Sequence, residues 1–219
     1  MNETAQLTVT VLALASATVA ILSSYFIRRR IVFYISKPLT TALILVPVLT
    51  LIPKSDSTYI PLIAGGLAFA LLGDIMLMLP ADRFILGIAS FATTHVLYLV
   101  AFISAVGVVL INLSSIPLIL FAALMTRFLW PGVRKSLRAP VLIYVVLITI
   151  MTIQAIGAAL ESENTGLAFA AAGSVFFLAS DSMLAVNRFR LPFSAAQALV
   201  LSTYWLGQWL IALSTRTGV

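Results

Sequence analysis

Two aspartates stand inside long apolar runs of this 219-residue chain. Asp74 lies in the stretch LLGDIMLMLP, residues 71–80, and Asp181 lies in FFLASDSMLAVNRF, residues 176–189. An aspartate in a membrane-spanning helix costs roughly 2.5–3.5 kcal/mol on insertion scales, so it needs a compensating contact or a task. Ionisable groups inside membranes generally mark proton relays, substrate sites or ion pathways. We therefore take the two carboxyl groups as the candidate chemical centre, with structural hydrogen bonding between helices as the alternative.

The residues around the two aspartates match at several positions. Glycine lies eight residues before each aspartate, phenylalanine five before, leucine three before, methionine two after and leucine three after. A small residue, Gly73 or Ser180, immediately precedes each aspartate and would allow the two helices to approach closely. The pattern predicts two parallel four-helix repeats, about 1–110 and 111–219, with both carboxyl groups at the same depth, roughly 8 Å inside the cytoplasmic edge of the hydrocarbon.

Further polar side chains fall at matching depths in the apolar runs that follow each aspartate. His95 and Tyr204 each lie eleven residues after the phenylalanine that opens their run, and Tyr98 and Gln208 follow about one turn later on the same helix faces. We expect these groups to line a cavity that opens at the cytoplasmic leaflet. Three residues are expected at its mouth: Arg83, Asn187 and Arg188. The tyrosines, arginines and asparagine each have a structural alternative. Tyrosines often serve packing, arginines can extend their charge to the membrane surface, and asparagine can end a helix.

The composition determines the kind of fold that must position these groups. Apolar residues make up 62% of the chain and charged residues 9%, and the mean hydropathy is +1.14. An ordinary soluble domain is excluded, and a bilayer-spanning helix needs about 20 mostly apolar residues. The strand alternation of a membrane β-barrel is missing from the sequence. We expect one all-α integral membrane domain, residues 1–219, with eight transmembrane helices at 5–27, 38–53, 59–79, 84–107, 113–130, 139–160, 165–186 and 193–214.

Basic residues are distributed unevenly between the two sides of this arrangement. With loops assigned alternately, one side has only Lys54 and Arg216. The other side has Arg28, Arg29, Arg30, Lys37, Arg83, Arg134, Lys135, Arg138, Arg188 and Arg190. Because positive loops stay in the cytoplasm, both termini are expected to be non-cytoplasmic, and the short loops suit a bacterial inner (cytoplasmic) membrane. The net charge of +6 then reflects topology and attraction to anionic lipids, and it does not indicate nucleic-acid binding.

The shortage of cysteine and histidine excludes several hydrolytic mechanisms. The chain has no cysteine and one histidine, so it can build neither a cysteine nucleophile nor a three-histidine zinc site. A serine hydrolase would depend on Ser90 or Ser180 with that single histidine, and the chain has no G-x-S-x-G nucleophile elbow. A proton-coupled transporter or flippase of a lipid-like substrate is the main alternative to an enzyme, because parallel repeats and buried carboxyl groups suit transport as well.

The polar residues also form a series of motifs. In chain order these are G-D-x-x-L at 73–77, F-x-x-G-x-x-x-F-x-x-x-H-x-x-Y at 84–98, S-D-x-x-L-x-x-N-R-F at 180–189 and Y-x-x-x-Q-x-x-I at 204–211. Their combination and order resemble the YhhN family, the lysoplasmalogenases, which are eight-span membrane proteins. The resemblance extends from the second span to the eighth.

The resemblance implies hydrolysis of the vinyl ether bond of a lysoplasmalogen, with a fatty aldehyde and glycerophosphocholine or glycerophosphoethanolamine as products. A vinyl ether hydrolyses by protonation of its β-carbon, and water captures the resulting oxocarbenium ion. Glycosidases solve a similar problem with one neutral and one charged carboxyl group. Burial and repulsion between two carboxylates both favour the neutral form of one of them. We therefore expect Asp74 and Asp181 to act as an acid and base pair, with neither role assigned.

The resemblance also implies roles for the other polar residues. His95, Tyr98, Tyr204 and Gln208 would position water or the glycerol oxygens. Arg83, Asn187 and Arg188 would lie at the interface, where the arginines would hold the phosphate. The expected partners are a lysophospholipid substrate and membrane lipid, and the chemistry requires no metal or cofactor.

Overall fold

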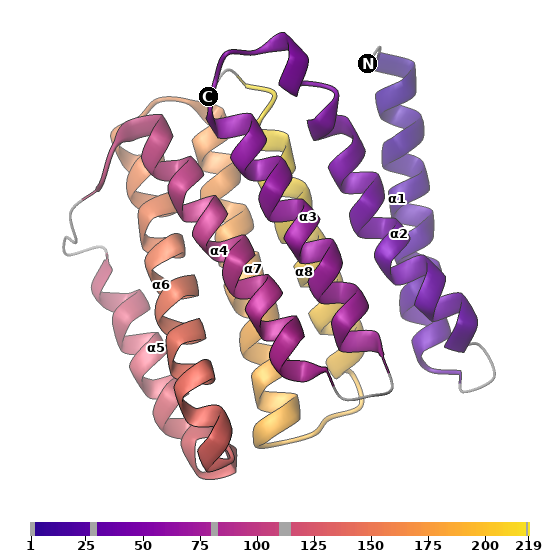
Figure 1. The fold of residues 1–219 in the computed structure, drawn as a ribbon, viewed down its shortest axis with the longest axis vertical. Coiled ribbons are helices and arrows are strands. Elements are labelled where there is room, and N and C mark those ends of the chain that lie inside the picture. The colour runs from indigo at the N-terminus through magenta and orange to yellow at the C-terminus, as the bar shows by residue number, and fades with distance from the viewer. Residues whose placement is uncertain (1–2, 27–29, 80–82, 110–114, 218) are drawn as a thin grey trace.

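The chain folds as a bundle of α-helices (Figure 1). A computed structural model describes residues 3–26, 30–79, 83–109, 115–217 and 219, and no strand occurs among them. The described α-helices are α1 (Glu3–Ser24), α2 (Arg30–Leu49), α3 (Tyr59–Met78), α4 (Phe84–Val106), α5 (Ile116–Leu129), α6 (Arg138–Glu161), α7 (Thr165–Phe189) and α8 (Ala196–Ser214). Short 3-10 turns are η2 (Ile52–Lys54), η4 (Trp130–Gly132) and η5 (Lys135–Leu137).

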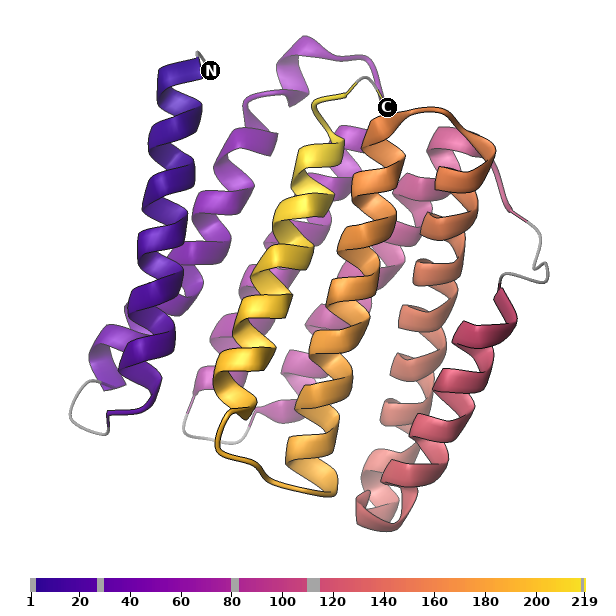
Figure 2. The ribbon, with the colours of Figure 1, turned by 180° about the vertical axis from the view of Figure 1, so that it is seen from behind.

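The helices are arranged in two layers with a pair at each flank. Opposite views place α3 and α4 on one face and α7 and α8 on the other (Figures 1 and 2). The pair α1–α2 lies at one flank, where α2 packs on α3 and α8. The pair α5–α6 lies at the other flank, where α6 packs on α4 and α7. Because α2 and α6 make corresponding contacts, each aspartate-bearing helix, α3 or α7, has one flanking helix beside it.

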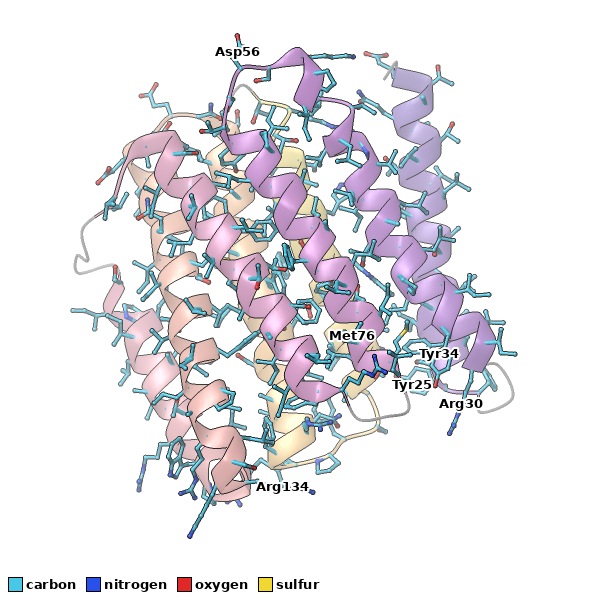
Figure 3. The ribbon with its side chains drawn as sticks, viewed as in Figure 1. Tyr25, Arg30, Tyr34, Asp56, Met76 and Arg134 are labelled. Carbon is cyan, nitrogen blue, oxygen red and sulfur yellow. The ribbon has the colours of Figure 1, made fainter. Side chains whose placement is uncertain are left out.

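The bundle has a basic end and an opposite end that holds both chain ends. Arg30 and Arg134 lie at the basic end, whereas Asp56 lies at the end where the N and C termini are found (Figures 1 and 3). Asp74 lies near the carboxyl end of α3 and Asp181 near that of α7, so both carboxyl groups lie closer to the basic end. Both aspartates therefore lie toward the same end of the bundle.

Six of the described helices are long and apolar enough to cross a membrane. The other two, α5 with 14 residues and α8 with 19, are not among the six. The expectation of an all-helical, multi-pass membrane protein is therefore confirmed, while the count of eight spans stays a prediction.

The second helix differs most from the sequence expectation. It begins at Arg30, eight residues before the predicted start at 38, and it takes Pro38 into its interior. Proline is tolerated inside membrane helices because neighbouring groups can satisfy the freed backbone. Lys37 consequently lies within α2, with 7% of its surface exposed, and the prediction that it belongs to a cytoplasmic loop is wrong. Arg28, Arg29 and the ends of the predicted spans 5–27 and 113–130 lie outside the described residues.

Small residues bring the helices of each layer close together. A Cβ atom on Gly173 of α7 would lie 2.6 Å from the carbonyl oxygen of Gly207 on α8, so these two backbones meet directly. A Cβ atom on Gly73 of α3 would lie 2.7 Å from the ring of Phe91 on α4. Ser180 donates a hydrogen bond to a backbone carbonyl of α8. The small residues before the aspartates therefore serve contacts within each layer, and their expected role in joining α3 to α7 is wrong.

Candidate active site

Asp74 is buried and ion-paired. Its residue surface is 1% exposed, and Oδ1 lies 3.1 Å from Nζ of Lys37. Oδ2 accepts hydrogen bonds from Oγ1 of Thr41 at 2.6 Å and from the hydroxyl of Tyr204 at 3.0 Å. The indole N–H of Trp205 donates to Oγ1 of Thr41 at 3.2 Å, which leaves the hydroxyl hydrogen of Thr41 directed at the carboxylate. An ammonium group and two hydroxyl donors thus surround this carboxyl group.

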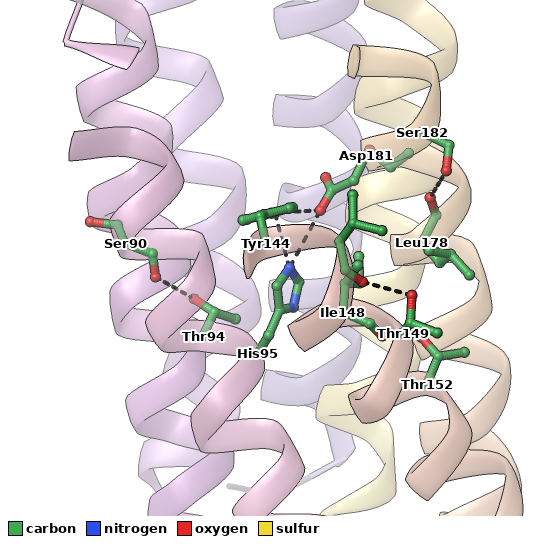
Figure 4. A network of polar contacts seen from close by, with 12 residues as sticks. Ser90, Thr94, His95, Tyr144, Ile148, Thr149, Thr152, Leu178, Asp181 and Ser182 are labelled. Atoms are coloured by element: carbon green, nitrogen blue, oxygen red, sulfur yellow. Dashed lines mark hydrogen bonds and ion pairs between the residues drawn. The ribbon is translucent and has the colours of Figure 1, made fainter. Parts of the chain in front are cut away.

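Asp181 has a phenol and an imidazole as partners instead of an ammonium. Its Oδ2 accepts a hydrogen bond from the hydroxyl of Tyr144 at 2.5 Å and lies 3.4 Å from Nε2 of His95 (Figure 4). The same nitrogen lies 2.9 Å from the hydroxyl oxygen of Tyr144. Because the single hydrogen of that hydroxyl is directed to Asp181, Nε2 must be the donor in its contact with Tyr144. The buried Nδ1 of His95 has no partner among the described residues, which fits an unprotonated nitrogen.

The two carboxyl groups line one cavity. The cavity has a volume of about 170 Å³, and we call it the reaction cavity. Its lining includes Lys37, Asp74, Asp181, Ser180 and Tyr204. Asp181 is the more accessible of the two acids, with 14% of its side chain exposed against 2% for Asp74. Both acids therefore border the same space.

Packed aromatic rings connect the residues that contact the two carboxyl groups. The ring of Tyr204 packs edge-on against Phe177 at 5.4 Å between centroids, and Phe177 packs against His95 at 4.8 Å. Phe91 contacts both Phe177 and Tyr204 in the same edge-on geometry. These contacts fix the rings that carry the donors, so the donors of both acids are held by a common packed cluster.

The contacts of the two acids correspond to one another. Lys37 on α2 and Tyr144 on α6 each stand 37 residues before the aspartate that they contact. Tyr204 on α8 donates to Asp74, and His95 on α4 contacts Asp181. Each acid thus has one partner from the helix before it and one from the last helix of the other half of the chain.

Comparison with known proteins agrees with this arrangement of motifs. The profile of the YhhN family matches residues 32–215, which include both aspartates and all four of their contacting helices. The chain belongs to the YhhN family.

Curated relatives of this YhhN-family chain include proteins named for an activity. Lysoplasmalogenase TMEM86A of Bos taurus is 34% identical over 157 residues, which cover 68% of this chain and 62% of the relative. Lysoplasmalogenase TMEM86B of Homo sapiens is 30% identical, covering 71% of this chain and 64% of the relative. The matches thus span less than two thirds of these relatives' length. The membrane protein YhhN of Escherichia coli O157:H7 is 26% identical over 83% of this chain and 86% of its own length. No solved structure matches significantly.

Two of the polar residues in the YhhN motifs lie apart from the acids. The hydroxyl of Tyr98 donates to Oε1 of Gln208 at 2.5 Å, and both side chains are fully buried. Neither residue lines the reaction cavity. The amide nitrogen of Gln208 has no partner among the described residues. This pair joins α4 to α8 deeper in the bundle, and the structure gives it no contact with Asp74 or Asp181.

The three YhhN-motif residues expected at the mouth make different contacts. Asn187 accepts a hydrogen bond from the backbone N–H of Phe193 at 3.2 Å, so it holds the turn between α7 and α8. The guanidinium of Arg188 lies 3.6 Å from the centroid of Phe84 and borders an apolar groove beside Asp181. Arg83 is exposed at the start of α4 and lines none of these spaces. Arg188 thus lies against the residue that follows Arg83, and the expected phosphate site of these residues stays a prediction.

The motif analysis missed four residues that contact the acids or support those contacts: Lys37, Thr41, Tyr144 and Trp205. A signal for two of them is present in the sequence. The spacing that relates Asp74 to Asp181 also relates Lys37 to Tyr144, both on helices that precede the aspartates. Thr41 follows Lys37 by one helical turn and therefore shares its face.

Proposed function

We propose that this chain is a membrane hydrolase that cleaves the vinyl ether bond of lysoplasmalogens. The products would be a fatty aldehyde and glycerophosphocholine or glycerophosphoethanolamine. The observation that carries the proposal is that two carboxyl groups with unlike partners line one small cavity. The names of the mammalian relatives support the same reaction.

The unlike partners assign the two chemical roles. The ammonium of Lys37 at 3.1 Å supports Asp74 as the base that stabilises a cation. Asp181 contacts a phenol and an imidazole through Oδ2, and this leaves Oδ1 available to carry a proton into the cavity. Asp181 is therefore the acid. This division resembles the neutral and charged carboxyl groups of glycosidases.

The proposed reaction has three steps, and the proton transfers return both aspartates to their starting states. Asp181 gives its proton to the β-carbon of the vinyl ether, and the resulting oxocarbenium ion lies near the charge of Asp74. Water adds to the α-carbon and loses a proton to Asp74, which forms a hemiacetal. The hemiacetal breaks its carbon–oxygen bond to the glycerol as Asp74 returns its proton to that oxygen. The hydroxyl proton of the hemiacetal passes to Asp181, so both acids regain their starting states and the aldehyde is released.

Aldehyde release from purified protein tests this proposal directly. Positioned acid and base groups contribute about 10²–10⁴-fold to a rate, so Asp181→Asn and Asp74→Asn should each lose turnover of that size. Asp56→Asn is the matched control, because Asp56 is exposed at the opposite end of the bundle. The saturated-ether analogue should give no aldehyde, since it has no carbon to protonate. Turnover like that of wild type in either active-site variant, with elution as a folded monodisperse species, would refute the mechanism.

We further propose that the chain crosses the membrane eight times, with both termini non-cytoplasmic and with two parallel repeats, about 1–110 and 111–219, forming one domain. The shared end of the two termini and the opposite location of Arg30 and Arg134 support this orientation (Figure 3). The common spacing of Lys37 and Tyr144 supports the repeat. Cysteine accessibility at residues 4 and 216, compared with residue 134, in bacterial inner-membrane vesicles would test the orientation. The chain lacks native cysteine, so each label reports one position.

A further inference from the structure

Three spaces in the basic half of the bundle share lining residues in a defined order. The first, which we call the vestibule, has a volume of about 460 Å³ and is lined by Tyr25, Arg30, Tyr34, Ser194 and Gln197 among others. Figure 3 shows Tyr25, Arg30 and Tyr34 near one another at the basic end. The vestibule shares Gln197, Phe33, Leu77 and Met78 with the reaction cavity. The two spaces are therefore neighbours.

The third space also adjoins the reaction cavity, and Leu77 borders all three spaces. It is a groove between α4, α5, α6 and α7, and its lining is almost wholly apolar, including Ile88, Phe121, Ala122 and Met125. We call it the apolar groove. It shares Asp181, Leu77, Phe91 and Leu184 with the reaction cavity. Asp181, the proposed acid, therefore stands where the polar space meets the apolar one.

The order of these spaces matches the chemical order of a single-chain vinyl ether lipid. Such a lipid has a phosphate head group, then a glycerol, then the vinyl ether, and finally a hydrocarbon chain. The vestibule offers a guanidinium, two phenols and three serine hydroxyls. The reaction cavity offers the two acids, and the groove offers hydrocarbon. A vinyl ether held at Asp181 would direct its chain into the groove and its glycerol toward Asp74 and Gln197.

We propose that these three spaces form one substrate path, in which Arg30 binds the phosphate and the apolar groove binds the alkenyl chain. The proposal rests on the function proposed above and adds the location and polarity of its substrate. It replaces the sequence expectation that Arg83 and Arg188 hold the phosphate. Arg188 borders the hydrocarbon groove and stacks on Phe84, whereas Arg30 belongs to the polar space on the other side of the acids.

Neighbouring alanines on α5 allow a matched test of the chain site. Ala122 lines both the apolar groove and an outer groove between α5 and α6, whereas Ala123 lines only the outer groove. Ala122→Trp should obstruct a long chain and leave a short one room. Forcing a chain past an overfilled site costs a factor of roughly ten to a hundred. Affinity for a saturated hexadecyl-ether lysophosphocholine should fall by about that factor, while affinity for the butyl-ether analogue stays unchanged.

Binding of these unreactive analogues is measured on detergent-solubilised protein, and aldehyde release from the matching vinyl ethers is measured in parallel. Ala123→Trp should resemble wild type with both chain lengths. An Ala122→Trp variant with the wild-type chain-length profile, or with equal losses for both chains, would overturn the groove assignment. The binding measurements test the substrate path without any reaction. Absence of aldehyde from wild-type protein would contradict only the proposed hydrolysis.

The head-group assignment is tested by charge removal. Arg30→Gln should weaken binding of the hexadecyl-ether lysophosphocholine by about tenfold, the value of one charge-assisted hydrogen bond. It should not affect hexadecylglycerol, which lacks the phosphate. Arg134→Gln is the control, because Arg134 is exposed at the same end and lines none of the three spaces. Loss of phosphate discrimination in Arg188→Gln, with none in Arg30→Gln, would overturn the proposed direction of the lipid.

Discussion

The ion pair between Lys37 and Asp74 makes a quantitative prediction about stability. Lys37→Met removes the ammonium and leaves a carboxylate whose side chain is 2% exposed. Breaking one side of a buried ion pair typically costs about 3–5 kcal/mol, because the remaining charge is uncompensated. The hydroxyls of Thr41 and Tyr204 still donate to Asp74, so we expect the lower half of that range. For a chain of this size, this corresponds to a fall in Tm of roughly 6–16 °C.

The double variant distinguishes an electrostatic effect from a loss of packing. Lys37→Met combined with Asp74→Asn removes both charges, and replacing a buried pair by neutral groups is often nearly neutral. We therefore expect the double variant to be more stable than Lys37→Met alone. The coupling energy from the complete cycle should exceed about 1 kcal/mol. Thermal unfolding in one detergent, followed by intrinsic tryptophan fluorescence, supplies all four values.

A control and a refuting result complete this experiment. Lys54→Met makes the same chemical change at an exposed residue in η2 and should alter stability by no more than about 0.5 kcal/mol. If the effects of Lys37→Met and Asp74→Asn add within about 0.5 kcal/mol, the pair is not coupled. In that case Lys37 cannot be the group that keeps Asp74 ionised, and the assignment of Asp74 as the base would fail.

Three other substitutions test separate contacts. Tyr144→Phe removes the hydroxyl donor of Asp181 and should lower kcat about tenfold with little change in thermal stability; an unchanged kcat would show that this hydroxyl does not orient the acid. Gly173→Val would place a side chain against the carbonyl of Gly207, and circular-dichroism melting should show a loss of about 1–3 kcal/mol, whereas a neutral result would contradict the close approach of α7 and α8. Tyr98→Phe leaves Gln208 without its buried donor and should cost about 1–3 kcal/mol by urea unfolding, with Tyr34→Phe as the exposed control; equal stability in both variants would contradict the isolated buried pair.

Features that depend on position along one helix could be predicted from the sequence. The apolar runs predict most helices within a few residues, and the shared spacing predicts that Asp74 and Asp181 have equivalent places on α3 and α7. The spacing also predicts that His95 and Tyr204 lie at the same depth in the membrane. In the structure, each of them contacts one of the two aspartates. These results follow because rise per residue is fixed in a helix, so depth is a property of sequence distance.

Features that depend on lateral packing could not be predicted in this way. Tyr98 and Gln208 share helix faces with His95 and Tyr204, yet they pair with each other, because the crossing of α4 and α8 decides which partners meet. Lys37 was misplaced because a proline next to a basic residue resembles the boundary of a span, and only the packed structure shows that the helix continues through it. Tyr144 has no unusual neighbours in the sequence and is identified only by its spacing to Asp181.

The difference between Lys37 and Tyr144 has a consequence for how the protein could be altered. Both residues stand 37 positions before an aspartate, but Lys37 presents an ammonium group and Tyr144 a phenol hydroxyl. Two ammonium groups would leave both carboxylates charged, and two phenols would leave neither acid with a fixed counter-ion. In the proposed repeat, two distinct reagents thus depend on a single exchanged side chain. Interchanging the two residues would exchange the proposed acid and base. The proton donor would then be Asp74, which does not line the apolar groove proposed for the alkenyl chain.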